Sequence, residues 1–121
     1  MDRRIDLSNL DLDRAATLIA ERRPTWLAQG LTVHPPTWMD NDAEWPAPLL
    51  TDRADARRPM SLGLRITRED PYAEAMLVLY AGGWADVDHI AAGSNDVASE
   101  YVEFDDADQF GPLLDRVVAA L

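Results

Sequence analysis

The chain has 121 residues and no cysteine, and its formal net charge at pH 7 is −11. This length is enough for one domain with its own core, so we expect residues 1–121 to form a single domain. The lack of cysteine excludes disulfides and thiolate metal sites. The sequence contains no apolar run long enough to cross a membrane and no hydrophobic signal-peptide region. We therefore expect a cytoplasmic protein without a membrane partner.

Helical spacing of apolar residues marks the first segment, residues 11–30, with the sequence DLDRAATLIAERRPTWLAQG. Asp11 is placed to cap this helix, and Gly30 is placed to end it with a left-handed residue. Pro24 must either kink the helix or start a second short one. The next residues, LTVH, read as a short strand.

Residues 34–60 hold five of the eight prolines in the chain. Because proline has no backbone donor, we expect a long loop here, with at most one helical turn, rather than a central strand. Trp38 and Trp45 argue against full disorder, since disordered segments are poor in aromatic residues.

Three acids in this loop alternate like the oxygen ligands of a calcium-binding loop: Asp40, Asp42 and Glu44. Such a loop needs glycine at its sixth position and glutamate at its twelfth, where this chain has Trp45 and Thr51. The match is therefore incomplete, and we expect no metal site there.

From Ser61 onward the pattern changes to strands. Four segments alternate apolar and polar residues: SLGLRITR, EAMLVLYA, WADVDHIA and VASEYVEF. Short turns separate them, which predicts an antiparallel meander.

The last segment, DDADQFGPLLDRVVAAL, has the apolar spacing of an amphipathic helix. Asp105 or Asp106 is placed to cap it, and Pro112 indicates either a late start or a bent first turn. The whole pattern predicts a two-layer α+β domain. In it, an N-terminal and a C-terminal helix pack on one face of a four- or five-stranded antiparallel meander sheet.

The hairpin LYAGGWADVDHI decides which side chains share a face. We expect a two-residue turn at Gly82-Gly83, which would pair Leu79 with Asp86. One face would then carry Leu77, Leu79, Ala81, Trp84, Asp86 and Asp88, and the better core face would carry Met76, Val78, Tyr80, Ala85, Val87 and His89. In this arrangement His89 points away from both aspartates, as a histidine with a satisfied ring at the edge of the core.

The excess negative charge lies in residues 69–121, which hold twelve acids and one arginine. Nucleic acid is a poor partner for such a surface, whereas a basic protein is a good one. Tryptophans among carboxylates provide contact area for such a partner. We predict a partner-binding surface in which Glu100 or Glu103 joins the hairpin acids according to strand register; its candidate residues are Trp38, Asp40, Asp42, Glu44, Trp45, Trp84, Asp86, Asp88, Glu100 and Glu103.

The sequence contains no catalytic or nucleotide-binding signature. Its serines lie outside any G-x-S-x-G turn, and there is no Walker loop and no G-x-G-x-x-G. We therefore expect no catalytic residue, metal or cofactor. Two alternatives stay open: an adaptor or chaperone module that binds protein, and a small metal-dependent or hydrolytic enzyme.

Three stretches follow one another in a characteristic order: TWLAQGLTV, MLVLYAGGWADVDHI and LLDRVVAAL. Their order resembles small actinobacterial immunity proteins of polymorphic toxin systems, in particular the TriTu-like group. The resemblance implies a non-enzymatic protein that binds and blocks one cognate toxin. It implies no catalytic residues.

Overall fold

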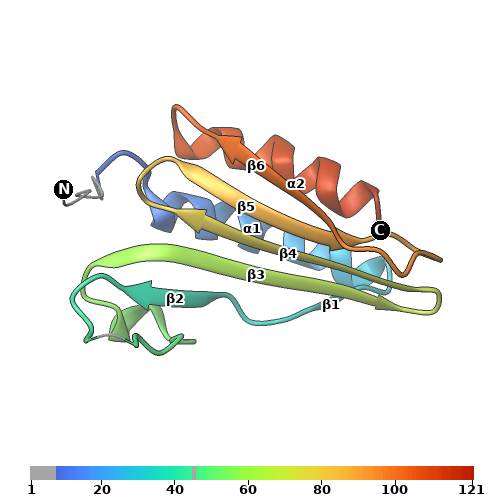
Figure 1. Ribbon diagram of the computed structural model, residues 1–121, viewed down its shortest axis with the longest axis horizontal. Helices are drawn as coiled ribbons and strands as arrows, with labels where there is room; N and C mark the ends of the chain where they lie inside the picture. Colours follow the sequence, from blue (N-terminus) through green and yellow to red (C-terminus); the bar gives the residue numbers. More distant parts are fainter. Residues whose placement is uncertain (1–7, 45) are drawn as a thin grey trace.

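The computed structural model describes residues 8–44 and 46–121, which form two layers (Figure 1). One layer is a six-stranded antiparallel sheet, and the other consists of two helices that cover one face of it. The two-layer α+β architecture expected from the sequence is confirmed, although the sheet has more strands than expected. The helices are α1 (Leu12–Ala28) and α2 (Phe110–Ala119), and the strands are β1 (Thr32–Val33), β2 (Thr37–Asp40), β3 (Pro59–Glu69), β4 (Tyr72–Tyr80), β5 (Trp84–Ile90) and β6 (Ala98–Glu103).

Strands β3 to β6 form the expected meander, and β6 is the last strand at one side of the sheet. At the other side, β1 and β2 both pair with β3, one after the other along its length. The expectation of a long loop over residues 34–60, with at most one helical turn, was wrong in one respect, because β2 lies within it. Pro35 and Pro36 precede this strand, and Pro59 enters its ladder with β3 only at the irregular end, opposite Asp40. On its other side β2 forms one isolated bridge, between Trp38 and Leu50. A short 3-10 helix, η1 (Arg53–Asp55), follows.

The capping residues of α1 act as predicted. The Asp11 carboxylate accepts a hydrogen bond from the backbone N–H of Arg14 at 3.1 Å, and Gly30 has the left-handed φ of +82°. Pro24 lies inside α1, which continues through it. The carbonyl that loses its partner there belongs to Ala20, an exposed residue, so water can supply the missing hydrogen bond. Among the described residues, no helix combines the length and the apolar character needed to span a bilayer.

The C-terminal helix starts with a tight turn. A 3-10 helix, η2 (Ala107–Gln109), comes first, and the Asp106 carboxylate caps it by accepting from the Gln109 N–H at 3.2 Å. Helix α2 begins at Phe110, two residues before Pro112. Pro112 therefore falls in the first turn, where its missing N–H costs no intrahelical hydrogen bond.

The hydrophobic core lies between the helices and the sheet, and the β4–β5 hairpin decides which residues enter it. Tyr80 pairs with Trp84, so the turn has three residues, Ala81–Gly83, and not the expected two. Leu77 and Leu79 consequently lie opposite Val87 and Ala85, and all four are fully buried.

This register corrects the predicted faces. Leu77, Leu79 and Ala81 were expected beside Asp86 and Asp88, but the one extra turn residue moves them into the core. The three β4 residues expected in the core instead lie on the face opposite to the helices: Met76, Val78 and Tyr80. Ala85 and Val87 of β5 are buried in the core as expected.

Candidate functional site

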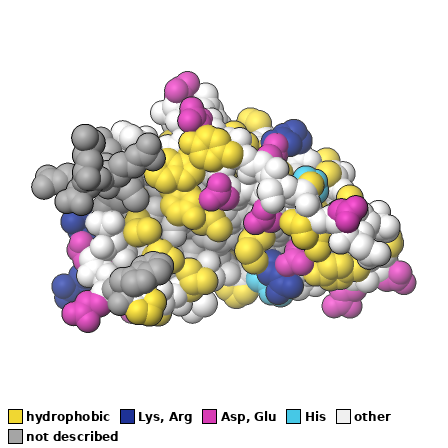
Figure 2. Space-filling view, in the orientation of Figure 1, with side chains coloured by type: hydrophobic (Ala, Val, Ile, Leu, Met, Phe, Trp, Pro, Cys, Tyr) yellow, Lys and Arg dark blue, Asp and Glu magenta, His cyan; other side chains and the backbone are white. Residues whose placement is uncertain are grey.

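The sheet face away from the helices is covered by neither α1 nor α2, and we call it the open face. Figure 1 looks onto it, and Figure 2 shows hydrophobic side chains gathered over β4 to β6 with acidic side chains among them. Cross-strand pairing places the following residues on this face: Arg65, Met76, Val78, Tyr80, Trp84, Asp86, Asp88, Ser99, Tyr101 and Glu103.

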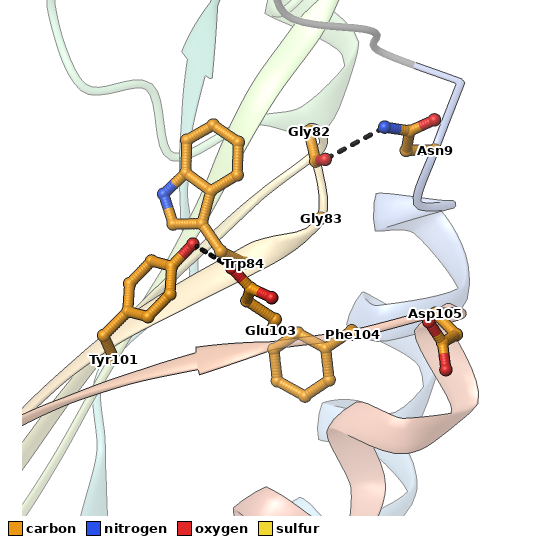
Figure 3. A pocket seen from close by; sticks show the side chains of 8 residues that line it. All are labelled: Asn9, Gly82, Gly83, Trp84, Tyr101, Glu103, Phe104 and Asp105. Carbon is orange, nitrogen blue, oxygen red and sulfur yellow. Dashed lines mark hydrogen bonds between the residues drawn. The ribbon is translucent and has the colours of Figure 1, made fainter.

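Aromatic rings lie on the open face beside the β4–β5 turn. Tyr80 and Trp84 stack with their ring centroids 5.2 Å apart and their planes 19° from parallel. Tyr101, 58% exposed, lies on the next strand, and its hydroxyl donates a hydrogen bond to the Glu103 carboxylate at 3.0 Å (Figure 3). Rings of this kind supply large contact area at a small entropic cost, which suits a binding surface.

A shallow polar pocket of about 360 Å³ continues this surface around the end of the hairpin. Figure 3 shows Trp84, Tyr101 and Glu103 among its lining residues, with Asn9 on the far side of the turn. The Asn9 side-chain amide donates to the Gly82 carbonyl at 3.0 Å, which ties the turn to the start of α1. The hairpin tip is therefore held in place beside the aromatic rings.

The carboxylates of β5 project from the same face. Asp88 accepts a hydrogen bond from the Ser99 hydroxyl on β6. Within the described part of the chain, the Asp86 carboxylate has neither a hydrogen bond nor an ion pair. The pKa of Tyr80 is raised, first by burial and then by the negative charge of Asp86. An exposed carboxylate without a cation beside an aromatic pair is a ready site for an incoming positive group.

The sequence left open whether Glu100 or Glu103 joins these acids, and the structure assigns Glu103. Glu103 lies opposite Trp84, whereas Glu100 lies opposite the buried Val87 and so points to the helix side. There its carboxylate accepts from the Arg116 guanidinium of α2 at 2.7 Å. Glu100 therefore belongs to the contact between the sheet and α2 rather than to the open face.

Two other predicted residues stabilise the fold instead of forming an exposed surface. Trp38 is only 4% exposed, because it lies opposite Leu62 on the core side of the sheet. The Arg53 guanidinium covers it, 5.3 Å from the ring centroid. The Asp40 carboxylate is buried and accepts three backbone N–H groups, from Asp42 at 3.0 Å and from two arginines at 3.1 and 3.2 Å.

These hydrogen bonds, with the Asp42 N–H as the largest cause, hold the pKa of Asp40 below its usual value. They also argue against a calcium site in this loop, because the carboxylate oxygens of Asp40 already accept backbone hydrogen bonds. Asp42 forms an ion pair with Arg58 at 3.1 Å, and Glu44 is exposed. Trp45 lies outside the described residues.

His89 points to the helix side, away from Asp86 and Asp88, as predicted. It lies between Ala75 and Ala98 on the neighbouring strands. The expectation of a satisfied ring was wrong, because Nδ1 is buried and has no hydrogen-bond partner within the described residues. No group of three or more metal-binding side chains occurs in residues 8–44 and 46–121.

A second hollow on the open face was missed by the sequence reasoning. It is an apolar groove of about 500 Å³ that follows β3, with Ser61 and Gly63 at its base. One wall comes from β4, and the other comes from β2 and the segment after it; the wall residues are Met76, Val78, Tyr80, Thr37, Met39 and Leu49. The sequence contained these residues, but the assumed two-residue turn placed the β4 wall in the core.

No protein-family model, curated protein or solved structure matches this chain. The fold and the open face together define a two-layer α+β protein with an uncovered acidic and aromatic sheet face.

Proposed function

We propose that this protein is a non-enzymatic binding module whose open face binds a basic protein. The observation that carries the proposal is the uncovered sheet face on which the Tyr80–Trp84 stack lies beside Asp86, a carboxylate without an ion pair among the described residues. A sheet normally buries one face and solvates the other with polar residues. Here the solvated face carries aromatic and methionine side chains, which is typical of a surface that a partner covers.

The charge of the open face supports a basic partner over nucleic acid. Its arginine, Arg65, is already bound to Glu74 at 2.6 Å, so it offers little to a phosphate. The carboxylates of Asp86, Asp88 and Glu103 remain in contact with solvent. They would pair with arginine or lysine of a partner and would speed its approach.

We further propose that the partner is a toxin and that the chain is a cytoplasmic immunity protein of a polymorphic toxin system. The support for this narrower proposal is the resemblance of the three stretches quoted above to such proteins. The open face suits the task, since an inhibitor must bind one partner tightly through a desolvated centre with a charged rim. The mechanism needs no catalytic residue, because occupation of the toxin surface is sufficient.

The test is co-expression with a basic protein that a neighbouring gene of the native host encodes. We expect that protein alone to stop growth of the host, and the present chain to restore growth and to co-purify with it. The variant Asp86→Arg with Asp88→Arg should lose both effects. A matched control, Asp55→Arg with Asp96→Arg, makes the same charge change at exposed positions on η1 and in the β5–β6 loop and should retain both.

Two results would contradict parts of the proposal. A complex that forms without any relief of toxicity would indicate an adaptor or chaperone module. Full rescue by the Asp86→Arg, Asp88→Arg variant, with a native circular dichroism spectrum, would show that the partner binds elsewhere.

A further inference from the structure

The apolar groove along β3 has the composition of a site for protein side chains. Three of its lining residues are methionines: Met39, Met60 and Met76. Methionine is unbranched and polarizable, so it adapts to apolar groups of different shape and is common at binding surfaces that must repack. Met76 and Leu49 are 42% and 63% exposed, so the groove is accessible to a partner from solvent.

The base of the groove is built to stay open. Gly63 has no side chain, and a Cβ there would lie 2.5 Å from the Thr37 hydroxyl oxygen. Ser61, the next residue on this face of β3, is small and buried. The sheet is therefore lower along β3 than along β4, where Val78 and Tyr80 rise beside it.

Negative charge follows one side of the groove at a fixed spacing. Asp86 is the cross-strand partner of Val78, and Asp88 is the cross-strand partner of Met76. Each carboxylate thus stands one strand, about 5 Å, beyond a residue of the groove wall. On the opposite side of Met76, Arg65 is the cross-strand partner, and its charge is compensated by Glu74.

From this juxtaposition we infer that the groove binds an amphipathic segment of the basic partner. Apolar side chains of that segment enter the groove, and its arginines or lysines lie on the β5 side against Asp86 and Asp88. The inference rests on the proposed function and adds to it which part of the partner is recognised. A second copy of this chain is the less favoured occupant, because each copy carries a net charge of −11.

The first experiment identifies which residue types the groove binds, and it does not require a known partner. A phage library of random peptides is selected on the full chain, and we expect enriched sequences in which apolar residues alternate with arginine or lysine. A synthetic peptide of the enriched sequence is then added to protein labelled with 13C on its methionine methyl groups. The signals of Met39, Met60 and Met76 should shift.

Matched variants test whether the groove itself is used. Met76→Ser and Leu49→Ser should each weaken binding of the peptide by about tenfold, because each removes exposed apolar wall. Leu27→Ser and Val97→Ser are the controls, since these residues are 46% and 61% exposed but lie on α1 and in the β5–β6 loop. Their affinity should equal that of the unaltered protein.

Several outcomes would overturn the inference. These are failure to enrich any peptide, enrichment of peptides that lack either apolar or basic residues, and equal affinity of the groove and control variants. Methionine shifts that depend on protein concentration without peptide would identify a second copy as the occupant instead. If the neighbouring basic protein binds and requires Asp86 but not Met76, the proposed function stands and only the groove inference falls.

Discussion

The Arg116 guanidinium of α2 donates to the Glu100 carboxylate of β6 at 2.7 Å, on the helix side of the sheet. Glu103, three residues later in the same strand, projects from the open face and lies opposite Trp84. Two glutamates of one strand thus belong to different surfaces. This relationship provides a matched pair for separating binding from stability.

Glu103→Lys should slow association with the proposed basic partner by about tenfold at low ionic strength, because it places a positive charge on the open face. Glu100→Lys should leave the association rate within about twofold, since its side chain points away from this face. Stopped-flow or surface plasmon resonance measurements at two salt concentrations would check this. Equal effects of the two substitutions would argue against the open face as the binding site.

Trp84→Ala should act on dissociation instead. The indole stacks on Tyr80 and provides apolar area on the open face beside the β4–β5 turn. Its removal should raise the dissociation rate about 10- to 100-fold with little change in association. Trp84→Phe keeps a ring, so its dissociation rate should lie between those of Trp84→Ala and the unaltered protein. A dissociation rate for Trp84→Ala that matches the unaltered protein would place the contact elsewhere.

Asp40 should make the fold sensitive to acid. Its folded pKa lies below the unfolded value of about 3.9, so it stabilises the fold above that pH and loses this contribution as the pH falls through the folded pKa. Asp40→Asn should therefore lower the melting temperature most at neutral pH. The difference from the unaltered protein should shrink steadily below about pH 4. A difference that stayed constant down to about pH 2 would show that charge plays no part.

Gly63 and Thr37 should be coupled. Gly63→Ala brings a methyl group against the Thr37 hydroxyl oxygen, so it should lower the free energy of unfolding by about 1–3 kcal/mol. Adding Thr37→Ala removes that oxygen and should recover most of the loss, as measured by urea unfolding of the four proteins in a double-mutant cycle. Simple additivity of the two substitutions would contradict the close approach.

Salt should stabilise the free protein. The net charge of −11 creates repulsion that screening relieves, while the exposed ion pairs that salt also weakens contribute little. We expect the melting temperature to rise by roughly 2–5 °C between about 0.01 M and about 0.15 M sodium chloride. Asp86→Asn with Asp88→Asn should show a smaller rise. A flat or falling melting temperature would mean that repulsion is not significant.

Much of the fold was predictable because its signals are local. The Asp11 cap, the Gly30 stop and the alternation of the four long strands each depend on neighbouring residues alone. Strand β2 was missed because the prolines on both sides of it indicated a loop. Its pairing with β3 joins residues about 20 positions apart, and a local sequence pattern does not predict such a contact.

The candidate site was predicted less completely than the fold, mainly because the β4–β5 turn has one residue more than expected. A hairpin turn of two or three residues fits the sequence around Gly82-Gly83 equally well, yet the choice decides whether Leu79 or Val78 accompanies Asp86. Trp38 was misplaced for another reason. Its position next to acids suggested exposure, but burial is set by Leu62 across the strand pair and by Arg53 from the following segment.

The stack of Tyr80 on Trp84 gives this surface a spectroscopic signal of its own. Two stacked rings couple their electronic transitions, so their near-ultraviolet circular dichroism depends on the angle between them. Trp26 and Trp38, each 4% exposed, are held in the core and should contribute a constant background. Binding of a ligand that reorients the stack should therefore change the near-ultraviolet circular dichroism spectrum, and no label on the protein is needed to detect it.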